Sequence, residues 1–207
     1  MVKDTGTRTG TRTGTRIGTR IGDKILNIVI FVVLVIYLSG YFKIRYFPLI
    51  PTICIYPDND IEVLEVKNLV NQNNQYYIQL FKKTDGTVRD AFKEIVDLDE
   101  SEIDKIVLSP HLIIITLMLK TIFNRARPKQ IYTSLNIQTS ISANTPAYPS
   151  GHCIQAYYLA KRLSIMYPNR SNEFYKLAED CALARVYAGL HYPSDNDFGK
   201  YIAINIL

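Results

Sequence analysis

The sequence predicts an all-α fold, a helical bundle preceded by a single N-terminal transmembrane helix. Residues 25–42 contain no charge, apolar residues recur at helical spacing in several segments after residue 86, and no stretch of any length alternates as a strand would. The chain has 207 residues, which is enough for one domain with an additional terminal segment.

Residues 1–24 form a basic tail in which the unit TGTR repeats. Gly, Thr and Arg offer little apolar surface to bury, so we expect this tail to be disordered. It carries six basic residues against two acidic ones, and therefore most of the net charge of +5. The rest of the chain is nearly neutral, so we expect no nucleic-acid partner.

The segment 25–42, ILNIVIFVVLVIYLSGYF, is predicted to be a transmembrane anchor. Its length at about 1.5 Å per residue approaches the roughly 30 Å of a hydrocarbon core. A buried core helix is the alternative, but such helices normally keep a polar face. A cleaved signal peptide is another, although no small-x-small cleavage site follows. Basic residues concentrate before the segment, which predicts a cytoplasmic N-terminus and a core, residues 43–207, on the other side.

Residues 43–85 are predicted to be a linker and peripheral segment, since Pro and Asn interrupt 43–75 and suggest loops or short extended pieces. The helical core is predicted over 86–207. Its expected helices, separated by a polar loop at 129–149, are 86–98, 100–108, 110–123, 151–166, 172–189 and one from Pro193 to the C-terminus. Charged pairs in the later helices argue against further membrane spans. The three cysteines, Cys54, Cys153 and Cys181, lack metal-ligand spacing and leave the redox compartment open.

Three basic residues fall where apolar residues are expected. Arg185 lies on the same helical stripe as Phe174 and Cys181. Lys120 continues an apolar row in the preceding long helix, and Arg127 follows seven residues later, on the same side if the helix persists. A buried, unpaired charge is costly, so each needs either a salt bridge or a bound anion. Together the three predict a pocket suited to phosphate.

The stretch Tyr148 to His152, YPSGH, precedes the helix at 151–166. Ser150 is placed to cap that helix, and Gly151 lets an anion approach the free backbone N–H groups at the helix start. A serine nucleophile is disfavoured because the G-x-S-x-G elbow needs a strand and a glycine two residues before the serine.

His191 lies just after the Arg185 helix, with Asp195 four residues further on. A histidine near a helix end can be no more than a partner for the helix dipole. A carboxylate that accepts from one ring nitrogen, however, leaves the other nitrogen with a free lone pair that could attack phosphorus. His152 could then give a proton to the leaving alkoxide.

These segments resemble the signature of the type 2 phosphatidic acid phosphatase and vanadium haloperoxidase superfamily. The three motifs of that signature, K-x6-R-P, P-S-G-H and S-R-x5-H-x3-D, correspond to Lys120 to Pro128, Pro149 to His152, and Ala184-Arg185 to Asp195. The serine that usually opens the third motif is Ala184 here.

The resemblance implies a helical phosphatase core that needs no metal and no cofactor, with vanadate as a phosphate-mimicking inhibitor. It implies that His191 is the nucleophile, Asp195 its orienting partner and His152 the general acid. The implied phosphate-binding residues are Lys120, Arg127, Ser150, Gly151 and Arg185.

The expected reaction is hydrolysis of phosphate monoesters or diphosphates through a phosphohistidine, with lipid phosphates such as phosphatidate or isoprenyl diphosphates favoured by the anchor at 25–42. The expected partners are this substrate and the membrane. Two alternatives stay open: a catalytically silent membrane interaction protein of the same fold, and a vanadate-dependent haloperoxidase. His111 lies outside the motifs and is expected to be an ordinary core or surface residue.

Overall fold

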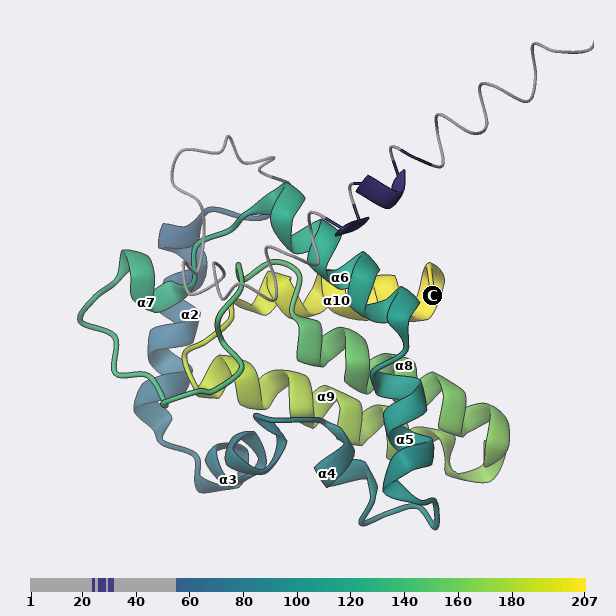
Figure 1. Ribbon diagram of the computed structural model, residues 1–207. Coiled ribbons are helices and arrows are strands. Elements are labelled where there is room, and N and C mark those ends of the chain that lie inside the picture. The colour runs from purple at the N-terminus through teal and green to yellow at the C-terminus, as the bar shows by residue number, and fades with distance from the viewer. Residues whose placement is uncertain (1–23, 25, 29, 32–54) are drawn as a thin grey trace, which may run out of the picture. The chain divides into compact units, whose positions relative to one another are not determined.

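The computed structural model describes residues 24, 26–28, 30, 31 and 55–207 (Figure 1). The chain divides into two units, Met1–Phe42 and Lys43–Leu207, and the second contains the candidate site. The described residues form helices and no strand, which confirms the all-α prediction. Most of the predicted anchor, 25–42, lies outside the described residues.

Two antiparallel helices form the centre of the second unit. Helix α8 (Gly151–Met166) is followed by a short 3-10 turn (Pro168–Arg170) and helix α9 (Ser171–Tyr187), and the two pack side by side (Figure 1). Helix α10 (Pro193–Asn205) packs against α8. Fully buried apolar side chains fill the space between them, among them Leu159, Leu163, Phe174 and Ile202. These bounds agree with the predicted helices 151–166, 172–189 and Pro193 onward.

Two helices occupy residues 59–84, within the predicted linker and peripheral segment 43–85, whose part up to residue 75 was expected to contain loops or short extended pieces. They are α2 (Asn59–Gln72) and α3 (Gln75–Thr84), and both pack against α9. Asp58 and Asn74, which looked like loop residues, instead cap the two helices by accepting hydrogen bonds from backbone N–H groups. Val66 on α2 and Phe81 on α3 are buried, on the apolar faces of the two helices. The loop prediction was wrong here because capping residues and loop residues are of the same types.

The middle of the described chain contributes four further helices. They are α4 (Arg89–Phe92), α5 (Glu100–Val107), α6 (Pro110–Phe123) and α7 (Pro128–Ile131). Helix α6 has the predicted bounds, with proline at its first position, whereas only four residues of the predicted helix 86–98 are α-helical.

No single helix among the described residues is long and apolar enough to cross a membrane. The bent pair Glu100–Val107 and Pro110–Ile131, with an angle of 41° between its parts, meets the requirements of length and composition.

Candidate active site

Lys120 lies in the last turn of α6 and its side chain is buried. Its Nζ donates to the carbonyl oxygens of Pro146, at 2.6 Å, and Ala147, at 3.4 Å. Burial and the nearby charge of Arg127 lower the pKa of Lys120 well below its ordinary value. Two loop carbonyls thus surround the ammonium group. A bound anion nearby would favour its charged form.

Arg127 reaches the same region from outside α6. The helix ends at Phe123, because Asn124 adopts the left-handed conformation with φ 44°, and Arg127 then precedes the proline that opens α7. The helix therefore does not persist to Arg127, which reaches the site from the segment between α6 and α7 instead. Arg127 Nε donates to Thr145 O at 2.9 Å, and Nη1 lies 3.1 Å from His191 Nε2.

Ser150 is the N-cap of α8, as predicted. Its Oγ accepts from the backbone N–H of Cys153 at 3.4 Å, and its own N–H donates to the Asp195 carbonyl oxygen at 2.9 Å. Ser150 is fully buried, and its hydroxyl hydrogen remains available for an acceptor. The helix start is thereby attached to the residue that contacts His191.

Gly151 is the first residue of α8 and does not need to be glycine for reasons of packing. A Cβ atom there would lie 3.4 Å from Thr116 Cγ2 and 3.6 Å from Lys120 Cε, which are ordinary contacts. Substitution of Gly151 can therefore show whether a ligand approaches the backbone closely at this position.

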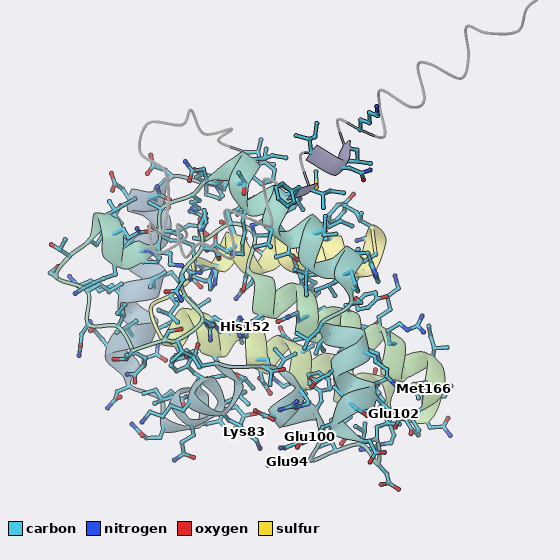
Figure 2. All side chains as sticks on the ribbon, in the orientation of Figure 1. Lys83, Glu94, Glu100, Glu102, His152 and Met166 are labelled. Carbon is cyan, nitrogen blue, oxygen red and sulfur yellow. The ribbon has the colours of Figure 1, made fainter. Side chains whose placement is uncertain are left out.

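His152 Nε2 lies 3.1 Å from the Asp85 carbonyl oxygen, and Figure 2 labels His152 among the described helices. A carbonyl can only accept, so Nε2 carries a hydrogen and Nδ1 is the nitrogen that can take up or release a second proton. Burial, followed by the charge of Arg185, lowers the pKa of His152 well below its ordinary value.

Arg185 extends from α9 into the same buried region and forms a salt bridge, one of the two alternatives for this residue. Its Nη1 donates to Asp85 Oδ1 at 2.8 Å and its Nη2 to Ser142 Oγ at 3.0 Å. The guanidinium also lies over the Phe81 ring, 4.9 Å from its centroid. Arg185 Nε is buried and has no hydrogen-bond partner among the described residues, so this N–H can still donate to a ligand oxygen.

His191 and Asp195 form the contact expected from their spacing. His191 Nδ1 is 3.0 Å from Asp195 Oδ2, which also accepts from the Tyr192 backbone N–H at 2.9 Å. Because the carboxylate accepts, Nδ1 carries the hydrogen and Nε2 keeps the lone pair, to which Arg127 donates. Burial, followed by the charge of Arg127, lowers the pKa of His191 well below its ordinary value. The imidazole is therefore neutral near pH 7.

The basic residues of the three motifs surround His191. Arg127 and Asp195 contact its ring, and Ser150 is hydrogen bonded to the Asp195 backbone. Gly151 lies next to Lys120, and His152 and Arg185 both contact Asp85. These contacts connect the predicted site residues: Lys120, Arg127, Ser150, Gly151, His152, Arg185, His191 and Asp195.

The sequence analysis missed Arg125, which is fully buried behind Asp195. Arg125 Nη1 is 2.8 Å from Asp195 Oδ1, and Nη2 is 2.7 Å from Glu62 Oε2. Its guanidinium lies between the rings of Tyr56 and Tyr192, at 4.3 and 3.9 Å from their centroids. A second arginine two residues before Arg127 was the available signal, but its acidic partner Glu62 lies on α2, where loop was predicted.

A cavity of about 190 Å³ lies beside the loop whose serines, Ser140 and Ser142, hydrogen bond to Asp85 and Arg185. It is lined by Ile137, Gln138, Thr139, Ser140, Ala143 and Leu190. It adjoins the candidate site through Ser140, which donates to Asp85, and through the Leu190 carbonyl, which accepts from Arg127 Nη1 at 2.9 Å.

A comparison with protein-family models matches residues 107–207 to the PAP2 superfamily. The match contains the three motifs and all eight predicted site residues. The comparison with curated proteins gave no match.

Proposed function

Because this chain belongs to the PAP2 superfamily, we propose that it is a metal-independent phosphatase that acts on phosphate monoesters or diphosphates through a phosphohistidine. One observation supports this most strongly. His191 is neutral, has its Nδ1–H on Asp195, and points its Nε2 lone pair toward Arg127, a cation suited to hold phosphate.

In the first step, Nε2 of His191 attacks phosphorus while the bond from phosphorus to the leaving oxygen breaks. Asp195 stabilises the positive charge that develops on the ring, as the carboxylate of a catalytic triad does. His152 gives the proton on its Nδ1 to the leaving oxygen. The group that departs is an alcohol from a monoester, or a phosphate monoester from a diphosphate.

In the second step, water attacks the phosphohistidine. His152, now neutral, takes a proton from this water, the bond between phosphorus and Nε2 breaks, and inorganic phosphate is released. Both histidines then have their original protons, so the cycle is balanced without a metal or another cofactor.

Five residues are proposed to hold the phosphoryl oxygens. Lys120, Arg127 and Arg185 supply positive charge, while the Ser150 hydroxyl and the Gly151 backbone N–H supply donors at the start of α8. The buried Nε of Arg185, which has no partner among residues 55–207 or the described residues of 24–31, supports this assignment, because a bound phosphate would accept from it.

The proposed substrates are lipid phosphates, such as phosphatidate or isoprenyl diphosphates. The uncharged segment 25–42 would anchor the enzyme in a membrane as a single span, with a cytoplasmic N-terminus and the core on the other side. A cavity of about 190 Å³ is smaller than a typical pocket for a drug-sized ligand, so a lipid chain would extend beyond it. Protease treatment of sealed vesicles tests the orientation, since the core must be digested only from the non-cytoplasmic side.

The full chain in detergent micelles should release phosphate from at least one member of a panel that contains phosphatidate, isoprenyl diphosphate and p-nitrophenyl phosphate. Vanadate should inhibit this release, and His191→Ala should abolish it. A folded protein that releases phosphate from none of them would overturn the enzymatic proposal in favour of a silent binding protein.

A further inference from the structure

Asp85 is a buried acid next to the candidate site, and it lies outside the family match at residues 107–207. It directly follows α3. Its Oδ1 accepts from Arg185, from Ser140 at 2.6 Å and from Ser142 at 2.7 Å, and its Oδ2 accepts from the Ile141 backbone N–H at 2.7 Å. These donors lower the pKa of Asp85 to about 2, against the effect of burial, so the carboxylate stays charged.

This carboxylate determines which part of Arg185 remains available. The two terminal nitrogens of Arg185 donate to Asp85 and Ser142, so the planar guanidinium is fixed from one edge. Within the part of the chain that the structure describes, the buried Nε is left without an acceptor. A phosphate oxygen at Nε would satisfy this donor without displacing Asp85.

The backbone of the same residue contacts the proposed general acid. The Asp85 carbonyl oxygen accepts from His152 Nε2, so this carbonyl sets the orientation and tautomer of the ring. Asp85 thus contacts one residue proposed to bind phosphate and one proposed to transfer a proton, through different atoms.

We propose that Asp85 is a positioning residue of this site, whose carboxylate orients Arg185 to present Nε to the phosphate and whose carbonyl directs His152 Nδ1 toward the leaving oxygen. This inference rests on the proposed phosphatase function. It adds a residue from the segment before the family match, and it assigns that segment a part in catalysis.

The charge of Asp85 also acts on His152. The charged or titratable groups that face His152 are Asp85 after α3, Arg185 on α9, Lys120 on α6 and His191 before α10. Arg185 and Lys120 lower the pKa of His152, and Asp85 raises it. Removal of this negative charge must therefore move the pKa of His152 further down.

Asp85→Asn in the full chain keeps the shape and the backbone carbonyl and removes the charge. We expect kcat to fall about tenfold or more, and the pH at which activity declines on the alkaline side to move lower. We expect vanadate to bind more weakly as well, because Arg185 loses the carboxylate that holds its Nε toward the anion. Weaker binding together with a shifted pH profile is not expected from a general loss of structure.

Asp180→Asn is the matched control. Asp180 is also a buried, ion-paired aspartate, but its partners are Tyr76, Tyr77 and Lys176 rather than site residues. It should lower the melting temperature without moving the pH profile. An unchanged kcat and pH profile in Asp85→Asn, or a loss of kcat with no change of the pH profile, would overturn the proposal.

A measurement on the wild-type chain covers the case in which Asp85→Asn does not fold. The chain has three histidines, so ring-nitrogen NMR resonances can be assigned by single substitutions. Neutral His152 must show hydrogen on Nε2 and none on Nδ1, and the opposite tautomer would contradict the inference. This readout does not need turnover, so it is distinct from a failure of the phosphatase assay itself.

Discussion

Arg125 and Asp195 form an ion pair, 2.8 Å from Nη1 to Oδ1, in which neither side chain is exposed to solvent. The other oxygen of Asp195 accepts from His191, so Arg125 acts on the proposed nucleophile through this carboxylate. Glu62 on α2 holds the far side of Arg125. The position of His191 therefore depends on a chain of charges that begins outside the family match.

We expect Arg125→Leu to lower the free energy of unfolding by about 3–5 kcal/mol, because Asp195 and Glu62 would keep buried charges without their partner. Chemical denaturation measures this loss. Arg170→Ala, which removes the exposed pair with Glu173, is the control and should leave the denaturation midpoint nearly unchanged. Equal stability of Arg125→Leu and the wild type would refute the buried network.

Gly151→Ala should separate ligand binding from folding. The added methyl group meets only ordinary contacts, and alanine favours a helix more than glycine does, so stability should be equal or higher. Vanadate binding should weaken about tenfold or more, because the Cβ would occupy the approach to the backbone N–H. Calorimetric titration with vanadate checks this, and unaltered affinity would exclude close approach of the anion at Gly151.

The pH profile should be displaced toward acid. His191 must be neutral to attack, so activity rises as pH rises through its pKa, and His152 must be protonated to act as an acid, so activity falls as pH rises through its pKa. Both pKa values in the free enzyme lie well below the ordinary value of 6.5. The maximum of kcat/KM should therefore lie below pH 6.5, and an optimum above pH 7.5 would contradict these assignments.

Arg185→Ala should weaken vanadate binding by about 2–5 kcal/mol, since it removes one side of a buried charge interaction. Because the substitution also leaves Asp85 without its arginine, binding and stability must be measured on the same preparation. Arg162→Ala on the exposed face of α8 is the control. If Arg185→Ala binds vanadate like the wild type, Arg185 is not part of the phosphate pocket.

Much of the helical core could be predicted from the sequence, because the signals that define it are local. Pro110 marks the start of α6 within one apolar run, and Ser150 marks the start of α8. The three motifs likewise identified the residues around His191. Spacing alone sufficed for the contact between His191 and Asp195, since both lie within four residues.

The parts that were missed depend on long-range pairing or on ambiguous residue types. Asp85 meets Arg185 across 100 positions of sequence, and Glu62 meets Arg125 across 63, so no local pattern connects them. Arg127 lies beyond the end of α6, so its approach to His191 depends on the left-handed turn at Asn124 rather than on helical periodicity. Asp58 and Asn74 were interpreted as loop residues because caps and loops use the same side chains.

The central claim, that His191 Nε2 carries the phosphoryl group, can be tested by rapid quench. The full chain should be mixed with a substrate labelled in the transferable phosphoryl group and quenched in base, in which phosphohistidine survives. Peptide mapping should place the label on Nε2 of His191, and His191→Asn should carry none. Turnover with no label on His191 during a pre-steady-state burst, or label on Ser150 instead, would contradict the account.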